Sequence, residues 1–179
     1  FFENETDRAG FLDIKNQSAS LRLNWEVSGS ATLTSVTSYD RGTWLTEEDG
    51  DGTPINFLTG YYASRGVSFS QDLRLASSGN GPLKWLVGAY FYRDRVNAGQ
   101  TQRYYFDFAG DADGNGQLDC FDDALTGCSY TNSLRQVRKS FAAYTHNELE
   151  LGGGFTATLG LRYTHDDNAR RADTAQPCA

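Results

Sequence analysis

The sequence predicts an all-β protein, an antiparallel meander of about six strands that forms part of a larger transmembrane β-barrel. Short periplasmic turns and long extracellular loops are expected to join the strands. Three observations predict this fold. Hydrophobic and polar residues alternate with a period of two in six segments, short and long connections alternate, and aromatic residues recur at both ends of the apolar face. The 10 Tyr, 11 Phe and 19 Gly suit strands joined by tight turns.

The first two predicted strands form a hairpin. Ala19–Val27 shows the cleanest alternation, with hydrophobic side chains at the odd positions and polar ones at the even positions. The turn Ser28–Ser30 leads to a second strand at about Ala31–Trp44, whose alternation is interrupted by Val36.

The third and fourth predicted strands are Val67–Leu75 and Leu83–Arg95, joined through Ser78–Pro82. Pro and Gly in this connection are typical of a turn. The fourth strand contains the longest apolar run of the chain, about Trp85 to Tyr92. This run is far shorter than the roughly 20 residues of a membrane-spanning helix, so no such helix is expected.

The fifth and sixth predicted strands are about Val137–Leu151 and Phe155–His165, joined by Gly152–Gly154. The remaining connections are long, roughly Thr46–Gly66 and roughly Val96–Gln136. Short turns at one end and long loops at the other are typical of outer-membrane barrels.

Aromatic residues mark both ends of the predicted apolar face. Those next to the short turns are Trp25, Trp85 and Phe155, and those toward the long loops are Tyr39, Phe91 and Tyr163. From Phe155 to Tyr163 a strand extends roughly 26 Å, which suits an apolar band about 25 Å tall. Ordinary core aromatics of a soluble sheet are the alternative.

The opposite face is strongly charged, which suits a wet lumen or the surface of an inserted plug. Its charged residues include Arg22, Asp72, Arg74, Lys84, Glu148, Glu150 and Arg162. A soluble one-sided sheet would also have such a face, but it needs a cover for its apolar side, and no amphipathic helix is visible. Six strands cannot close a barrel, so we expect further strands outside this sequence.

The net charge of −7 argues against nucleic acid as a partner and disfavours binding to anionic lipid head groups. The chain starts at Phe1 without Met and ends in polar sequence, so residues 1–179 are expected to be a fragment of a longer barrel domain.

Four phrases in order resemble TonB-dependent outer-membrane receptors. Phe69–Ser77 resembles the family phrase "FSQELRLAS", and Leu83–Phe91 resembles the strand that follows it. Ala31–Tyr39 and Gly160–Asp166 are also similar to the family. The resemblance covers about residues 19 to 167.

The resemblance implies a 22-stranded barrel in the outer membrane of a Gram-negative bacterium, filled by a plug domain. It implies active uptake of a scarce ligand, such as a ferric siderophore, cobalamin or a glycan. The implied partners are the outer-membrane lipid, the receptor's own plug and the TonB–ExbB–ExbD complex, which pulls on a TonB box. Neither plug nor TonB box is found in this sequence. No covalent step is implied, so the chain is not expected to be an enzyme.

A calcium-loop pattern occupies the second long connection, at residues 111–122. The candidate ligands, at the spacing of hard oxygen donors, are Asp111, Asp113, Asn115, Gln117, Asp119 and Asp122. Gly116 allows the sharp turn, but position twelve is Asp instead of the longer Glu, and no helices flank the loop. The alternatives are a structural Ca²⁺ and a polar surface loop without metal.

The three cysteines leave two alternatives open. Cys120 and Cys128 flank one polar segment and either form a disulfide, which suits an oxidising compartment, or remain free thiols. Cys178 is left over, and no partner for it is identified.

No other motif indicates catalysis. His146 is expected to face the lumen and His165 to lie near the outer rim, each without a catalytic partner. Glu47–Gly52 is expected to be a solvated loop tip, and Tyr61–Tyr62 and Tyr104–Tyr105 to be loop aromatics. The competing functions are a passive porin or surface-binding barrel and a soluble calcium-stabilised β-domain.

Overall fold

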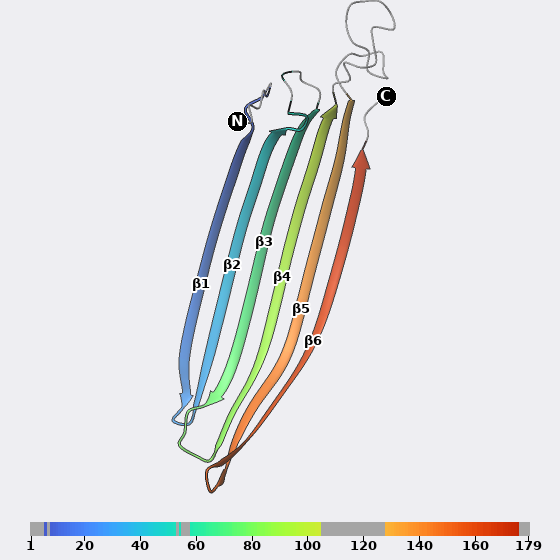
Figure 1. The fold of residues 1–179 in the computed structure, drawn as a ribbon. Coiled ribbons are helices and arrows are strands. Elements are labelled where there is room, and N and C mark those ends of the chain that lie inside the picture. The colour runs from blue at the N-terminus through green and yellow to red at the C-terminus, as the bar shows by residue number, and fades with distance from the viewer. Residues whose placement is uncertain (1–5, 7, 53, 55–57, 105–127, 176–179) are drawn as a thin grey trace, which may run out of the picture.

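A single sheet makes up the computed structural model, which describes residues 6, 8–52, 54, 58–104 and 128–175. Its six strands are β1 (Phe11–Ser28), β2 (Ala31–Asp49), β3 (Leu58–Ser77), β4 (Leu83–Tyr104), β5 (Cys128–Gly152) and β6 (Phe155–Ala175). Each strand pairs antiparallel with the next, in the order β1-β2-β3-β4-β5-β6. The predicted meander is confirmed, and Figure 1 shows it as an open sheet with β1 and β6 at its edges. No helix within the described residues is long and apolar enough to cross a membrane.

The strands begin or end at the short turns almost where the sequence predicts, but they continue much further toward the long connections. The predicted Val67–Leu75 is part of the 20-residue β3, and the predicted Phe155–His165 is part of the 21-residue β6. Alternating hydrophobicity reports a strand only where one of its faces is apolar. In the extra lengths both faces carry polar residues, while the backbone pairing continues without interruption.

Each short connection lies at the same end of the sheet, which we call the turn end; the opposite end is the loop end. In the β5–β6 connection Gly153 and Gly154 have φ values of 62° and 84°. Two successive residues at positive φ match the twist of a two-residue hairpin, and only glycine adopts this conformation at little cost. This explains the Gly152–Gly154 run.

Paired residues of an antiparallel sheet share a face, so the register assigns every side chain. Odd-numbered residues of all six strands lie on one face, the apolar face, and even-numbered residues lie on the polar face. The seven charged residues named above for the polar face all lie on it.

A second layer does not cover the apolar face within the described residues. Leu21 is 57% exposed, Trp25 65% and Leu159 60%, while Trp85 is partly exposed. The only buried hydrophobic residue described is Ala142, which lies on the polar face. The sheet therefore has no hydrophobic core of its own on the side where its hydrophobic residues lie.

Eight aromatic residues of the apolar face form two slanted lines, while Phe11 and Tyr61 lie further toward the loop end. The upper rim, toward the loop end, consists of Tyr39, Phe69, Phe91, Phe141 and Tyr163 on β2 to β6. The lower rim, near the turns, consists of Trp25, Trp85 and Phe155. Phe69 and Phe91 are neighbours in the upper rim, with ring centroids 6.4 Å apart.

Both rims drift toward the turn end from β1 to β6. Tyr39 pairs with Phe69, but Phe69 pairs with Arg93, so Phe91 lies two residues lower; Phe141 pairs with His165, so Tyr163 is again two residues lower. The upper rim thus descends about one residue per strand. With about 3.3 Å per residue and about 4.8 Å between strands, this drift corresponds to a tilt of about 35°. The short turns in Figure 1 descend in the same direction.

Candidate functional site on the polar face

Some charged residues of the polar face form ion pairs and contacts with aromatic rings. Near the turn end, the Arg74 guanidinium donates to both carboxylate oxygens of Asp72, with Nη2 2.6 Å from Oδ2. The Arg162 guanidinium lies over the Tyr144 ring, 5.6 Å from its centroid. Tyr144 in turn donates its hydroxyl proton to Asp72 Oδ1 at 2.7 Å. Four side chains from three strands therefore form one connected network.

Gly88 makes this network possible. Arg74 pairs with Gly88, and Gly88 pairs with Tyr144, so Gly88 lies between the two side chains on β4. A Cβ at Gly88 would lie 2.3 Å from Tyr144 Cζ, which is a severe clash. The absent side chain leaves the space through which the Tyr144 ring crosses β4 to reach β3.

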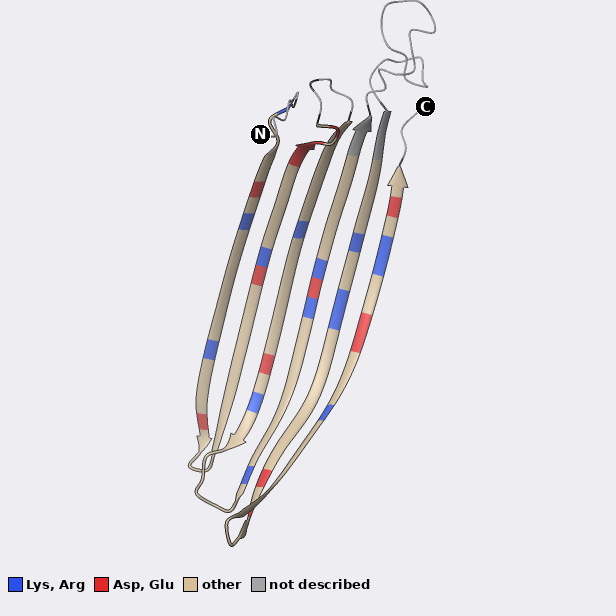
Figure 2. Cartoon of the chain, viewed as in Figure 1, with Lys and Arg blue, Asp and Glu red and all other residues tan. Residues whose placement is uncertain are grey.

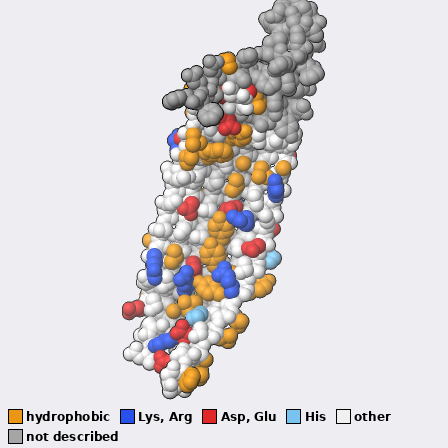
Figure 3. All heavy atoms as spheres, in the orientation of Figure 1, with side chains coloured by type: hydrophobic (Ala, Val, Ile, Leu, Met, Phe, Trp, Pro, Cys, Tyr) orange, Lys and Arg blue, Asp and Glu red, His pale blue; other side chains and the backbone are white. Residues whose placement is uncertain are grey.

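A second charge pair lies nearer the loop end. Arg138 donates to Asp94 at 2.9 Å, and its guanidinium lies 5.7 Å from the centroid of Tyr92. Tyr92 also donates to Asp94 at 3.3 Å. The space-filling view shows a column of hydrophobic side chains flanked by charged ones on the face turned to the viewer (Figure 3).

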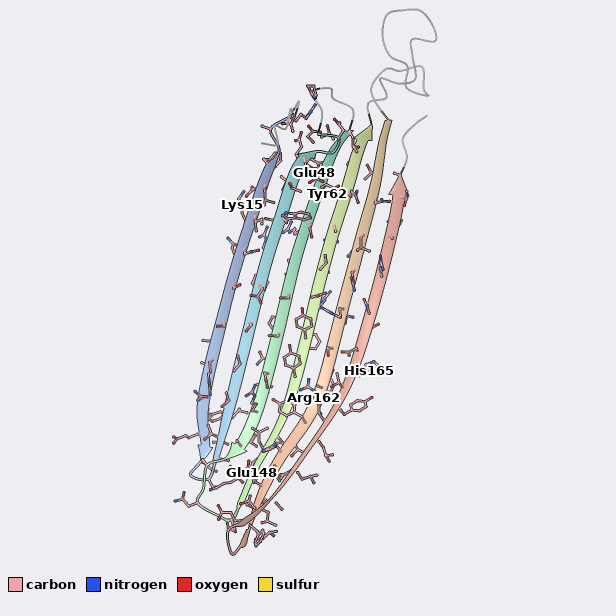
Figure 4. The ribbon with its side chains drawn as sticks, viewed as in Figure 1. Lys15, Glu48, Tyr62, Glu148, Arg162 and His165 are labelled. Carbon is pink, nitrogen blue, oxygen red and sulfur yellow. The ribbon has the colours of Figure 1, made fainter. Side chains whose placement is uncertain are left out.

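Trp44 and Tyr62 form an aromatic pair close to the loop end. Their ring centroids are 6.2 Å apart and the rings are inclined by 26°, which is a stacked arrangement. They line a hollow of about 410 Å³ together with polar residues, among them Ser64, Gln100, Asn132 and Arg170. Figure 4 labels Tyr62 and Glu48 in this region and Glu148 and Arg162 near the turns.

The hollow has the components of a binding site for a polar organic molecule. A stacked aromatic pair provides a flat surface for rings or sugar faces, and amides and a guanidinium provide hydrogen bonds. Sequence analysis did not identify Trp44 or pair it with Tyr62, because their contact depends on the β2–β3 register. The only signal was that both are even-numbered aromatics in segments where the other aromatics are mostly odd-numbered.

Each histidine lies on the face of the sheet that its even or odd residue number predicts. His146 is on the polar face, with Nε2 3.1 Å from Glu148 Oε1, and His165 is on the apolar face beside the upper rim. The exposed His146–Glu148 pair has no nucleophile beside it among the described hydrogen bonds. Within the described part of the chain, no group of three or more His, Cys, Asp or Glu could hold a metal ion.

The predicted calcium ligands Asp111, Asp113, Asn115, Gln117, Asp119 and Asp122 lie outside the described residues. Cys120 and Cys178 also lie outside them. Cys128 is the first residue of β5, and its side chain is not described. The calcium site and the Cys120–Cys128 disulfide therefore stay predictions.

The acidic stretch Glu47–Gly52 is only partly a loop. Glu47 and Glu48 belong to β2, which ends at Asp49. Asp49 Oδ1 accepts hydrogen bonds from the backbone N–H groups of Asp51 and Gly52, both at 3.0 Å. The carboxylate thus closes the end of the hairpin. Tyr61 and Tyr62 are likewise strand residues of β3, on opposite faces, and not loop aromatics.

Comparisons with known proteins give structural matches only. No protein-family model and no curated protein matches the chain. One matching solved structure is the ferric yersiniabactin uptake receptor FyuA from Yersinia pestis, with 11% identity and a TM-score of 0.41 over 92% of this chain. Another is the siderophore receptor PiuA from Acinetobacter baumannii, with 14% identity and a TM-score of 0.41 over 97% of this chain. The chain is thus similar to parts of two such receptors and spans 26% and 31% of their lengths.

Proposed function

We propose that the sheet is a wall segment of a TonB-dependent receptor in the outer membrane of a Gram-negative bacterium. The complete receptor binds a scarce ligand of the siderophore, cobalamin or glycan type and takes it up with energy from TonB–ExbB–ExbD. The odd-numbered hydrophobic side chains contact lipid, and the polar face lines the lumen, against water and the receptor's own plug. Further strands close the barrel, 22 in all by resemblance to the family.

The drift of the aromatic rims carries the membrane part of this proposal. A tilt of about 35° lies at the lower limit of the 35–45° at which strands cross an outer membrane. Two parallel rims on one face, six to eight residues apart along a strand, correspond to the aromatic girdles at the two interfaces of a bilayer. A soluble sheet has no interface that would align its aromatics in this way.

The uncovered apolar face supports the same proposal. Leu21, Trp25 and Leu159 each expose more than half of their surface, and burying such side chains is favourable by about 1.5–3 kcal/mol each. Lipid provides this burial without a second protein layer. A soluble β-domain would need a cover that none of the described elements supplies.

The coupling to TonB is supported by the family resemblance of Phe69–Ser77, Leu83–Phe91 and the two further phrases. The ligand-binding part is supported by the polar hollow beside Trp44 and Tyr62. We infer that these two aromatics contact the ligand or the plug from the wall side.

Quenching by brominated lipid tests the orientation of the sheet. We use the complete receptor of which this chain is a part, here called the full chain, reconstituted into phosphatidylcholine vesicles. Trp25 and Trp85 are expected to be quenched, while Trp44 is not, because Trp44 is on the polar face and also lies beyond the upper rim. Trp25→Phe therefore removes quenchable fluorescence and Trp44→Phe removes fluorescence that resists quenching. Equal quenching of all three would refute the proposed orientation.

Uptake by whole cells distinguishes the receptor from a passive porin. Cells that produce the full chain are exposed to labelled ferric siderophores, cobalamin and oligosaccharides, with and without a proton uncoupler. A receptor accumulates one ligand class only while the membrane is energised, whereas a porin equilibrates small solutes regardless. Trp44→Ala is expected to weaken binding of that ligand more than Tyr61→Ala, because Tyr61 is on the opposite face.

A further inference from the structure

Six basic residues cluster on the apolar face, immediately beyond the upper aromatic rim. They form what we call the basic belt, on β2 to β5, and consist of Arg41, Arg65, Arg93, Arg95, Arg135 and Lys139. All six are exposed. The blue segments of Figure 2 lie across neighbouring strands in this part of the sheet. The chain as a whole has a net charge of −7, so this clustering is a local reversal of its charge.

The belt follows the slant of the rim strand by strand. Arg41 is the next residue of the same face beyond Tyr39, Arg93 the next beyond Phe91, and Lys139 the next beyond Phe141. Arg65 and Arg95 lie one position further along their strands, and Arg135 two. A random distribution of surface charge would have no reason to track a line that descends one residue per strand.

The belt residues lack counter-charges of their own. Among the described residues none of the six makes a hydrogen bond or ion pair. On the polar face at the same height, by contrast, Arg138 is paired with Asp94 at 2.9 Å. One acid, Asp167, lies beside the belt, opposite Lys139 in the register. The apolar face therefore carries a large net positive charge at the height of the basic belt.

A hollow of about 800 Å³ adjoins the belt on its loop-end side. Arg65 and Arg135 line it, together with Lys15 and Arg171. These last two are paired with Asp13 and Asp173, at 2.6 and 2.9 Å. The belt thus borders a space in which a bulky head group fits.

We propose that the basic belt binds the phosphate groups of anionic lipid head groups in the leaflet on the loop side. This inference rests on the proposed membrane orientation, which puts the upper rim at the interface and the belt at head-group height. Guanidinium groups bind phosphate oxygens in bidentate fashion, and five of the six belt residues are Arg. The net charge of the whole chain disfavours binding to anionic lipid, and it gives no indication of this local positive surface.

Retention of lipid by the purified full chain tests the proposal. The chain is equilibrated in mixed micelles of phosphatidylcholine and phosphatidylglycerol, and retained lipid is counted by native mass spectrometry. The variant Arg41→Gln/Arg93→Gln removes two belt cations, and Arg22→Gln/Lys84→Gln removes two cations from the polar face as a matched control. Each basic residue near an anionic surface changes the affinity about fivefold, so the belt variant is expected to lose roughly 25-fold for phosphatidylglycerol.

The control variant is expected to retain phosphatidylglycerol as the unchanged chain does. Equal losses in both variants, or no preference for phosphatidylglycerol over phosphatidylcholine, would overturn the belt. Displacement of the lipid by inorganic phosphate alone would likewise overturn it, because the bound species would then be free phosphate. Brominated-lipid quenching of Trp25 and Trp85, measured on the same samples, separates the outcomes: quenching without anionic preference refutes only the belt, and no quenching refutes the proposed orientation.

Discussion

Tyr144 on β5 donates a hydrogen bond of 2.7 Å to Asp72 on β3, across the full width of β4. Contacts that skip a strand are uncommon, because the side chain of the intervening strand normally occupies the space. Here Gly88 leaves it free, and Arg74 and Arg162 hold the two partners from either side. The contact ties three strands together where the backbone ladder alone links only neighbours.

Gly88→Ala is expected to destabilise the folded protein by about 1–3 kcal/mol, the usual cost of inserting a methyl group where it does not fit. The new Cβ would meet Tyr144 Cζ at 2.3 Å, so the ring must move and its hydrogen bond breaks. Gly66→Ala is the control, because Gly66 is on the same face with nothing within 4 Å of its Cβ position. Urea unfolding of the full chain in lipid vesicles measures both, and equal effects would contradict the explanation.

Tyr144→Phe is expected to cost about 1 kcal/mol, because it removes one hydrogen bond while Arg74 continues to satisfy Asp72. Tyr90→Phe is the matched control, since the Tyr90 hydroxyl makes no hydrogen bond within the described residues. The free energy of unfolding of the double variant Gly88→Ala/Tyr144→Phe should be close to that of Gly88→Ala. A fully additive result would mean that the two residues act independently.

Leu159→Arg tests which face contacts lipid. Leu159 lies midway between Phe155 and Tyr163 on the apolar face, and a charge at the middle of a bilayer costs about 2–4 kcal/mol. Thr158→Arg, one residue away, is on the polar face opposite Glu148 and is expected to be tolerated. The comparison uses urea midpoints in vesicles. If Thr158→Arg were the more damaging change, the faces would be reversed.

Gly154→Ala is expected to destabilise the β5–β6 hairpin by about 1–2 kcal/mol, because an L-residue with a side chain is strained at a φ of 84°. Gly29→Ala in the β1–β2 turn serves as the control, since Gly29 is not at positive φ and has an open Cβ position. Refolding yield into vesicles reports the difference. Similar yields for both variants would count against the strained turn.

Calcium binding by residues 111–122 is testable by terbium luminescence on the full chain. If the loop binds Ca²⁺, terbium is sensitised and Ca²⁺ displaces it, whereas Asp111→Asn/Asp113→Asn abolishes the signal. Glu47→Gln/Glu48→Gln removes two acids elsewhere and is expected to leave the signal unchanged. A signal that persists in the Asp111→Asn/Asp113→Asn variant would disprove the site.

The sequence predicted the number of strands, their order and the faces of the side chains within the six predicted segments, because a period of two fixes parity once the turns are recognised. It did not predict how far the strands extend. Beyond Tyr39 on β2 and Phe91 on β4, polar residues predominate on both faces, so no regular alternation remains from which a strand could be predicted. Those lengths depend on backbone pairing between strands.

The candidate site was predicted only in part. Asp72, Arg74 and Arg162 were assigned to the polar face from parity, but their connection through Tyr144 depends on Gly88, which is unremarkable in sequence. The stacking of Trp44 on Tyr62 likewise depends on the β2–β3 register, in which Trp44 pairs with Ser64 and not with Tyr62. The register between two strands cannot be predicted from the alternation of residues along one strand.

The length of the strands beyond the upper rim determines how far from the rim a molecule in the medium first contacts the protein. On β5, 13 residues separate Phe141 from Cys128, a rise of roughly 35 Å at the observed slant. In a bilayer, the part of this length beyond the basic belt would stand clear of the lipid as a stiff, hydrogen-bonded collar. Under the proposed function, a ligand would then enter through an opening above the membrane surface, and the continuous backbone hydrogen bonds of the strands would fix the dimensions of that opening.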